Sequence, residues 1–404
     1  MESNKIRVAV YTFGCKVNLF ESEQLKKSLI NVEIVDSEED ADYYIINGCT
    51  VTSSSDSQVR NMARRFAKKG RVIITGCYAR KEDKFMGEEE GITVVENIDA
   101  VATLFNSEFI YNIDCDRARP FIKIQEGCNQ FCSYCIIPYV RGSELKSVPF
   151  EDIKKLLKTL SEQGFREVVL SGIHVGKYGA DFRYEKRISD VVELSWEIIG
   201  RVRLSSIEPI EIDANLLKKA AEGKMLPHWH IPIQHGSDNI LRAMNRPYTA
   251  AECAEYIIKV SEAYSSFPAI GTDIIAGFPG ETERDFKQMV EFVEKLPFTY
   301  GHVFPFSPRE GTPAWELHRK NPVAPDVIKE RSKILRDIFE AKKEAFYKYN
   351  IGKETDMILE EEIEPNHFRG TSGNYMYLDY FGSGKLRELK KVVVEEKNSS
   401  YIGI

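Results

Sequence analysis

Short, wholly apolar runs alternate with helical patterns in the amino-terminal part of the chain, and this alternation limits the fold more than any other feature of the sequence. Three such runs lie at 8–11, 43–46 and 72–74, with a helical pattern between each pair. Strand-helix repetition with short apolar strands predicts a parallel sheet that is covered by helices on both faces. We therefore expect a doubly wound α/β domain over residues 1–112.

A Gly-Cys pair follows each of the three runs. The cysteines are Cys15, Cys49 and Cys77, which lie 34 and 28 residues apart in the chain. A single cysteine at the end of a strand is most often just a small buried side chain. Three repeats of the pattern favour a shared function, because ligands of open α/β sheets bind beyond the carboxyl ends of the strands. We name these cysteines the sheet set and expect them to converge.

A second strand-helix series begins after a polar linker at 113–120. Its six strand-like runs are separated mostly by helical patterns, which predicts an incomplete, six-stranded α/β barrel over 121–350. In such a barrel the chemistry belongs at the carboxyl ends of the strands. The runs lie at 121–124, 167–170, 202–205, 230–233, 272–275 and 302–306.

Residues 351–404 have a different pattern. Short strand-like runs alternate there with glycines, which predicts a small all-β barrel as a third domain. This segment contains seven Lys and Arg against ten Asp and Glu. Its net charge therefore does not by itself indicate nucleic-acid binding.

Three further cysteines lie close together just after the first strand of the central series. Cys128, Cys132 and Cys135 have the spacing CxxxCxxC, and we name them the loop set. A structural zinc ion needs four protein ligands, whereas an iron-sulfur cluster can take three cysteines and leave one iron open to a substrate or cofactor. The missing fourth cysteine therefore favours a cluster with an open iron.

Composition and length limit the classes of protein to consider. The chain has 404 residues, 43% of them hydrophobic, which is enough for two or three domains with their own cores. No apolar run approaches the roughly 20 residues of a membrane span, and the start lacks the pattern of a signal peptide. We expect a cytoplasmic protein, a monomer without membrane contact. Its eight cysteines are spread over a large chain, which favours metal or redox use over a disulfide framework.

The charge of the chain argues against indiscriminate binding of nucleic acid. The net charge is −7, and the sequence pI is about 5.7. One basic run stands out, and it is either a solvated helix face or a contact surface for a phosphate backbone. It consists of Arg60, Arg64, Arg65, Lys68, Lys69 and Arg71.

The chain contains other cysteines and histidines, but they do not have the spacing in sequence that is typical of metal ligands. Cys115 lies in the linker and Cys253 in a helical pattern, while His230 and His235 have no partner carboxylate in a metal-site pattern. We expect structural roles for all four.

The loop set and the residues that follow it, 128–142, resemble the radical S-adenosylmethionine signature of the methylthiotransferases. The resemblance covers the whole chain: the sheet set matches the family's amino-terminal domain, and 351–404 resembles its TRAM domain, a module associated with RNA binding. Further blocks occur in the family's order at 171–179, 203–209, 230–237, 277–282 and 307–313.

This resemblance implies two 4Fe-4S clusters and S-adenosylmethionine as cofactors. The loop set would hold one cluster, whose open iron binds S-adenosylmethionine, and one electron would cleave that cofactor to a 5′-deoxyadenosyl radical. Insertion of sulfur at an unactivated C–H bond needs such a cofactor-generated radical. The sheet set would hold the second cluster, which delivers the sulfur, and a further S-adenosylmethionine would supply the methyl group.

Four other residues are candidates for contact with S-adenosylmethionine. Tyr134 matches an aromatic position near the adenine in this superfamily, and Gly172 would allow close approach of the backbone. Glu208 and Gln234 would bind ribose hydroxyls or the methionyl end. For these two, a role as polar residues that close barrel strands is an equal alternative.

The substrate implied by the resemblance is N6-threonylcarbamoyladenosine beside the tRNA anticodon. Lys16 and Val17 stand where the isopentenyladenosine branch usually has Gln-Met, and Thr52 stands where that branch has Arg. Glu208 also suits the threonylcarbamoyl branch. Gly48 departs from it, since Thr is usual there, but the cluster ligand is unaffected.

The expected product is the 2-methylthio form of that nucleoside. The expected partners are the tRNA anticodon stem-loop, a reductant protein such as flavodoxin or ferredoxin, and a sulfur donor. Alternative substrates are isopentenyladenosine in tRNA and an aspartate of a ribosomal protein. The non-enzyme alternative is an RNA-binding protein in which the metals only stabilise the fold.

Overall fold

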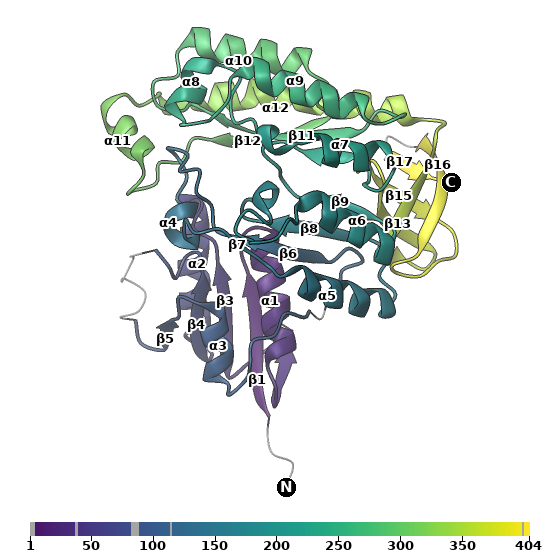
Figure 1. The fold of residues 1–404 in the computed structure, drawn as a ribbon. Coiled ribbons are helices and arrows are strands. Elements are labelled where there is room, and N and C mark those ends of the chain that lie inside the picture. Colours follow the sequence, from purple (N-terminus) through teal and green to yellow (C-terminus); the bar gives the residue numbers. More distant parts are fainter. Residues whose placement is uncertain (1–4, 37–38, 82–88, 114, 398–399) are drawn as a thin grey trace.

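The computed structural model describes residues 5–36, 39–81, 89–113, 115–397 and 400–404. Figure 1 shows three units in chain order: an amino-terminal sheet with its helices, a central set of strands with its helices, and a small carboxyl-terminal barrel. Residues 1–4 at the start of the chain and Asp114 of the expected linker lie outside the described residues. None of the described helices is long and apolar enough to span a membrane.

The amino-terminal unit is a five-stranded parallel sheet between helices. Its elements are β1 (Ile6–Thr12), α1 (Lys16–Ser28), β2 (Val32–Val35), β3 (Tyr43–Gly48), α2 (Ser53–Phe66), β4 (Arg71–Gly76), β5 (Ile92–Val94) and α3 (Ile98–Leu104). The strand order is β2-β1-β3-β4-β5. Neighbouring residues point to opposite faces, so Ile45 packs with α1 and α3, whereas Tyr44 and Ile46 pack with α2. The expected doubly wound sheet is confirmed.

The central unit contains two sheets, β7-β6-β8-β9 and β10-β11-β12, in which the six strands other than β7 are parallel. A parallel bridge between Ser206 and His230 joins the sheets, so the expected incomplete barrel is confirmed. The short β7, which the sequence did not predict, pairs antiparallel with β6. The strands are β6 (Phe121–Glu126), β7 (Lys146–Ser147), β8 (Val168–Gly172), β9 (Val202–Leu204), β10 (His228–His230), β11 (Ala269–Ala276) and β12 (Tyr300–Pro305).

One strand lies earlier in the chain than the apolar run at 230–233 predicts. The strand β10 ends at His230, although Ile231 still donates a backbone hydrogen bond to Gly271 of β11. Pro232 has no N–H group and cannot continue the ladder. Gln234 follows in a left-handed conformation, with φ of 66°, which turns the chain at the carboxyl end of the strand.

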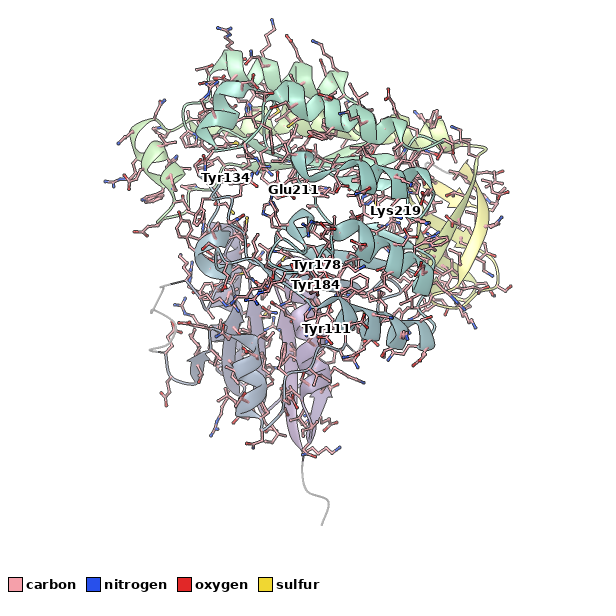
Figure 2. All side chains as sticks on the ribbon, in the orientation of Figure 1. Tyr111, Tyr134, Tyr178, Tyr184, Glu211 and Lys219 are labelled. Carbon is pink, nitrogen blue, oxygen red and sulfur yellow. The ribbon has the colours of Figure 1, made fainter. Side chains whose placement is uncertain are left out.

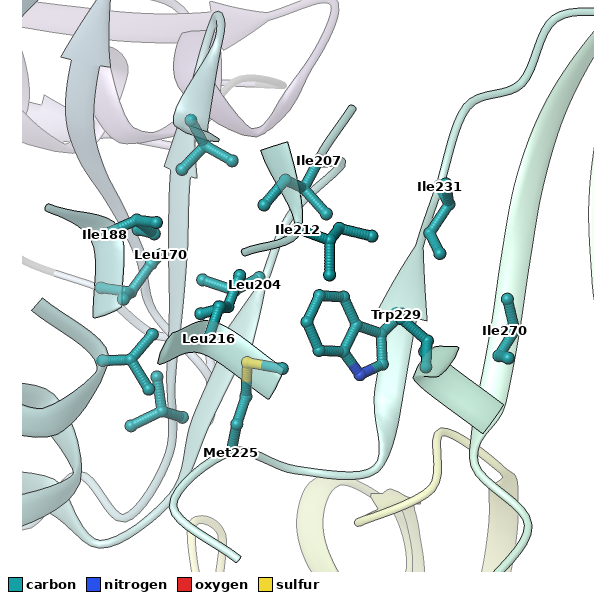
Figure 3. Close-up of a cluster of buried hydrophobic side chains, with 14 of the residues drawn as sticks. Leu170, Ile188, Leu204, Ile207, Ile212, Leu216, Met225, Trp229, Ile231 and Ile270 are labelled. Carbon is teal, nitrogen blue, oxygen red and sulfur yellow. The ribbon is translucent and has the colours of Figure 1, made fainter. Parts of the chain in front are cut away.

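Helices cover the central strands, and apolar side chains fill the space between the two layers. Figure 3 shows this core around the fully buried Trp229, with Leu204 of β9 and Ile270 of β11. The helices are α4 (Ile137–Arg141), α5 (Phe150–Glu162), α6 (Ile188–Ile199), α7 (Ala214–Ala221), α8 (Asp238–Ala243), α9 (Ala250–Glu262), α10 (Glu283–Lys295), α11 (Pro313–Lys320) and α12 (Pro325–Asn350).

The amino-terminal unit packs directly on the central unit through α1. This helix lies against β6 at one edge of the partial barrel (Figure 1). Its Phe20 is fully buried in the core cluster of the central unit. The start of α1, which follows Cys15, is thereby held beside the interior of the barrel.

The carboxyl-terminal unit is a closed five-stranded barrel in the order β13-β14-β15-β17-β16, as expected. Arg203 of β9 donates hydrogen bonds to the carbonyl oxygens of Ser372 and Gly373 at 3.2 Å each, and Arg119 pairs with Glu360 at 2.8 Å. These contacts fix the small barrel against the central unit. Its strands are β13 (Glu354–Glu364), β14 (His367–Ser372), β15 (Tyr377–Phe381), β16 (Leu389–Lys397) and β17 (Ser400–Gly403).

Candidate active site

The sheet set lies at the carboxyl edge of the amino-terminal sheet, in the loops after β1, β3 and β4. Cys15 is exposed at the start of α1, whereas Cys49 and Cys77 are buried. A Cβ atom added to Gly14 would lie 2.9 Å from the Cβ atom of Cys49, so the first two loops touch. Both Cys49 and Cys77 interact electrostatically with Cys15. The expected convergence of the three cysteines is therefore present in the structure.

A network of buried amides positions these loops. The Sγ atom of Cys15 donates to Oδ1 of Asn18 at 3.2 Å, and Nδ2 of Asn18 donates to Oδ1 of Asn47 at 2.9 Å. Nδ2 of Asn47 in turn donates to the backbone carbonyl of Asn18 at 2.9 Å. Because Asn47 precedes the Gly-Cys pair of β3, this network fixes the ends of β1 and β3 relative to each other.

Arg141 of the central unit reaches into the sheet set. Its Nε atom donates to the Sγ atom of Cys77 at 3.0 Å, and its Nη2 atom donates to Oε2 of Glu21 on α1 at 2.9 Å. Burial alone would raise the pKa of Glu21, but the charges of Lys123 and Arg141 lower it to about 2. Sequence reasoning missed Arg141 as a functional residue, although it lies within the motif that continues the loop set.

The loop set begins immediately after β6. Gly127 has φ of 79°, and a side chain there would collide with the backbone carbonyl of Glu144. Cys128 lies with its Sγ atom 3.4 Å from Nδ1 of His174, whose Nε2 lies 2.7 Å from Glu211. Burial alone would lower the pKa of His174, but hydrogen bonds to Cys128 and Glu211 raise it to about 10. His174 was not predicted as a site residue.

Arg246 connects the second cysteine of the loop set to Glu208. Its Nη1 atom donates to Sγ of Cys132 at 3.2 Å, and its Nη2 atom forms a buried ion pair with Glu208. Tyr248 donates to the same carboxylate at 3.3 Å. Burial nevertheless raises the pKa of Glu208. Glu208 thus has protein partners of its own in Arg246 and Tyr248.

A pocket of about 260 Å³ lies between the two cysteine sets. Tyr134, Cys135 and Gln234 line it from the central unit, and Val51 and Thr52 of the loop after β3 line it from the amino-terminal unit. Figure 2 labels Tyr134 in the loop after β6, on the side of the central strands where their carboxyl ends lie. The pocket thus borders on both cysteine-bearing loops.

Gly172, at the end of β8, does not open onto this pocket. A Cβ atom there would lie 3.1 Å from Cβ of Gln125 and 3.2 Å from its Oε1 atom. The same Oε1 atom accepts a hydrogen bond from the backbone N–H of His174 at 2.7 Å. The missing side chain of Gly172 therefore makes room for Gln125, which supports the histidine beside Cys128.

A larger hollow, of about 630 Å³, lies at the opposite end of the amino-terminal sheet. It is lined chiefly by apolar residues such as Ile6, Ile30, Val32 and Leu104. The described residues that line it include no cysteine, histidine or carboxylate. The described lining of this hollow therefore offers no residue of the metal-binding type that Cys135 contributes to the smaller pocket.

Lys16, the first residue of α1, brings a positive charge toward the pocket. Its ammonium group lies 5.9 Å from the ring centroid of Phe121. Burial and then repulsion from Arg203 and Arg119 lower the pKa of Lys16, whereas attraction from Asp273 opposes this shift. Asp273 itself lines the pocket, so the Lys16 side chain interacts electrostatically with a carboxylate of the pocket wall.

A second arginine fastens the amino-terminal unit near the pocket. Arg309, in the loop after β12, pairs with Asp56 of α2 at 2.8 Å and donates to the hydroxyl of Thr50 at 2.8 Å. Thr50 directly follows Cys49. Arg309 and Arg141 therefore hold two different loops of the sheet set from the side of the central unit.

Comparison with known proteins agrees with this arrangement. The profile described as "Radical SAM superfamily" matches residues 122–293, and that of "Uncharacterized protein family UPF0004" matches residues 7–96. The chain is 35% identical to "Threonylcarbamoyladenosine tRNA methylthiotransferase MtaB" of Aquifex aeolicus, with 96% of this chain and 100% of that protein covered. The chain belongs to the radical S-adenosylmethionine methylthiotransferase family.

The names of other similar methylthiotransferases differ in the substrate that they state. The MtaB protein of Thermotoga maritima is 31% identical over 93% of this chain and 92% of that protein. A "tRNA-2-methylthio-N(6)-dimethylallyladenosine synthase" of Fervidobacterium nodosum is 33% identical over 90% of each. Among solved structures, the radical S-adenosylmethionine methyltransferase TsrM of Kitasatospora setae has a TM-score of 0.56, 12% identity and 78% coverage of both chains, a likeness of fold alone.

As a member of this family, the methylthiotransferase is an enzyme that uses S-adenosylmethionine and carries two 4Fe-4S clusters. Each cysteine set offers three thiols, with no disulfide among the described cysteines. Burial raises the pKa of Cys77 to about 11 and that of Cys135 to about 12, but metal coordination deprotonates a thiol outright. Arg141 and Arg246 beside the sulfurs favour thiolates, so both sets fit an anionic cluster.

Proposed function

We propose that this methylthiotransferase adds a methylthio group at C2 of N6-threonylcarbamoyladenosine, next to the anticodon of tRNA. The observation that carries the proposal is the pocket between the cysteine sets, which borders Cys135 on one side and the loop of Cys49 on the other. A substrate bound there would contact both sites at once, as transfer of sulfur to an activated carbon requires.

The proposal assigns the loop set, Cys128, Cys132 and Cys135, to the cluster that binds S-adenosylmethionine. It assigns the sheet set, Cys15, Cys49 and Cys77, to the cluster that delivers sulfur. When bound, these groups supply the radical chemistry that an unactivated C–H bond demands.

The chain's own residues prepare the site for that chemistry. Tyr134 and Gln234 line the pocket, where they would contact S-adenosylmethionine or the substrate. Arg246 and Arg141 hold one sulfur of each set. Gly172 and Glu208 act through Gln125 and Arg246 in this scheme, so they position other residues rather than touch the cofactor.

Two positions favour the threonylcarbamoyl substrate over isopentenyladenosine. Thr52, which differs from the arginine usual in the isopentenyladenosine branch, lines the pocket. Lys16, which replaces a neutral residue of that branch, interacts electrostatically with the pocket carboxylate Asp273. The second candidate function is modification of isopentenyladenosine, because a relative named for dimethylallyladenosine is 33% identical to the chain.

The test is conversion of defined RNA by the protein reconstituted anaerobically with iron and sulfide. Anticodon stem-loops that carry either N6-threonylcarbamoyladenosine or isopentenyladenosine are incubated with S-adenosylmethionine and reductant, and the nucleosides are analysed by mass spectrometry. We expect a 2-methylthio product from the first RNA. A product from the second RNA alone would overturn the proposal, and absence of 5′-deoxyadenosine would overturn the enzyme assignment itself.

A further inference from the structure

Side chains inside the central barrel form layers along neighbouring strands. On β12, the ring of His302 lies 5.7 Å from that of Tyr300 and 6.4 Å from that of Phe304. Residues two apart on a strand share a face, and Phe304 lines the pocket between the cysteine sets. His302 therefore lies one layer beneath the pocket wall.

His302 shares this layer with side chains of the two preceding strands. Nε2 of His230 lies 2.9 Å from Oδ1 of Asp273, and the rings of His230 and His302 are 5.5 Å apart. His302 is exposed, and Asp273 of the same layer lines the pocket, so the pocket reaches this layer. Lys16 interacts electrostatically with both Asp273 and His302, and we call His230, Asp273, His302 and Lys16 the polar layer.

Lys16 supplies the polar layer with a positive charge that lacks a close counterion. Among the described residues, no carboxylate lies within 4.0 Å of its ammonium group. The neighbouring arginines differ in this respect, because Arg203 pairs with Glu167 at 3.0 Å and Arg119 pairs with Glu360 at 2.8 Å. A half-buried ammonium group without a partner is suited to receive an anion from outside the chain.

A metal cation is the other ligand to consider, since His230, Asp273 and His302 offer ligand atoms within 4.8 Å of one another. The only carboxylate of that group already bonds to His230 at 2.9 Å, and it also attracts Lys16. A cation would have to displace His230 from Asp273, and it would be repelled by the positive charge of Lys16. The charge balance of the layer therefore favours an anion.

We propose that Lys16 binds the free carboxylate of the threonylcarbamoyl group and thereby determines the substrate. This inference rests on the proposed function and extends it to one side chain. The threonyl moiety attached at N6 of the base ends in a carboxylate, whereas the isopentenyl group is an apolar hydrocarbon. With the base in the pocket, the N6 substituent enters the polar layer. There the ammonium group of Lys16 binds the threonyl carboxylate, and His302 lies in the same layer.

The test compares two substrates that differ only at this carboxylate. Reconstituted enzyme is given an anticodon stem-loop that carries either N6-threonylcarbamoyladenosine or the same nucleoside with the threonine as its carboxamide, and kcat/KM for the methylthio product is measured. A charge-assisted hydrogen bond predicts that wild-type enzyme prefers the acid by about 10- to 100-fold. Equal use of acid and carboxamide by wild-type enzyme would overturn the inference.

Variants then assign the preference to Lys16. We expect Lys16→Gln to lower kcat/KM for the acid by about 10- to 100-fold and to leave the carboxamide within about twofold of wild type, so that the preference disappears. Lys16→Arg keeps the positive charge, so we expect this variant to retain most of the preference for the acid. Lys158→Gln, which removes an exposed lysine of α5, is the matched control and leaves both values unchanged.

Because Lys16 follows Cys15, iron and sulfide content and 5′-deoxyadenosine formation are measured for every variant. A Lys16→Gln protein with full iron content that loses the same factor on both substrates would overturn the inference while the proposed function stands. Wild-type enzyme that converts only the isopentenyladenosine stem-loop would instead remove the proposed function itself. The measurements on wild type and on the variants therefore distinguish failure of the Lys16 inference from failure of the proposed function.

Discussion

Arg141 joins Cys77 to Glu21: its Nε atom lies 3.0 Å from the sulfur and its Nη2 atom 2.9 Å from the carboxylate. The arginine belongs to the short helix that follows the loop set, whereas both of its partners belong to the amino-terminal unit. The buried side chain of Arg141 therefore contacts a cysteine of the sheet set, while its helix directly follows the loop set in the chain.

Replacing Arg141 by methionine should destabilise the protein. The change leaves Glu21 buried with only Lys123 as a cationic partner, and breaking a buried ion pair costs about 3 kcal/mol or more. Unfolding of the apoprotein in urea measures the loss. Arg141→Met combined with Glu21→Gln should lose less than the sum of the single changes, and strict additivity would show that the pair does not interact.

Acid should weaken the fold partly through Glu21. Its pKa in the folded protein, about 2, lies below the unfolded value of about 4.3. The ionised carboxylate therefore stabilises the fold above pH 4.3, and this contribution disappears as the pH falls from about 4.3 toward 2. Urea unfolding across this range should show a shallower pH dependence for Glu21→Gln than for wild type. Parallel curves would show that Glu21 titrates normally.

The two cysteine sets should separate in function. Cys77→Ala should reduce the iron content from about eight to about four atoms per chain. It should retain 5′-deoxyadenosine formation but give no methylthio product. Cys135→Ala should lose both activities. Iron and sulfide assays with product analysis check this, and loss of 5′-deoxyadenosine in Cys77→Ala would contradict the assignment of the sets.

Arg309→Ala should separate methylthio transfer from 5′-deoxyadenosine formation, as Cys77→Ala does, but without removing a cysteine. Loss of the contacts to Asp56 and Thr50 frees the loop of Cys49 from the central unit. Methylthio product should fall by about tenfold or more, in keeping with the strength of charged hydrogen bonds, while 5′-deoxyadenosine formation persists. Arg319→Ala, on the exposed surface of α11, is the control and should change neither. Equal loss of both products in Arg309→Ala would indicate general unfolding.

The sequence predicted the elements well where the signal was local. The apolar runs predicted at 8–11, 43–46 and 72–74 lie within β1, β3 and β4, and the convergence of the sheet set followed from the strand-end pattern. The strand at 230–233 was misplaced because Pro232 interrupts its ladder. Element boundaries depend on such single residues, which apolar periodicity does not register.

The supporting residues of the site could not be predicted in the same way. Arg141, His174 and Arg246 meet their cysteines across sequence separations of 64, 46 and 114 residues. An arginine or histidine in a sequence has no local pattern that identifies a distant partner. The sequence offered a hint for two of them, because Arg141 lies soon after the loop set in the same motif and His174 lies in the block at 171–179.

The strand order β2-β1-β3-β4-β5 also bears on how the protein matures. The sheet set is spread over three loops that meet only once β1, β3 and β4 have paired, so a cluster held there, as proposed, would be loaded after this pairing. The loop set needs only the few residues from Cys128 to Cys135 and can bind iron on a nascent chain. If the cysteine sets hold the clusters as proposed, we expect an order of biogenesis in which the locally encoded centre can be filled before the centre that depends on the tertiary structure.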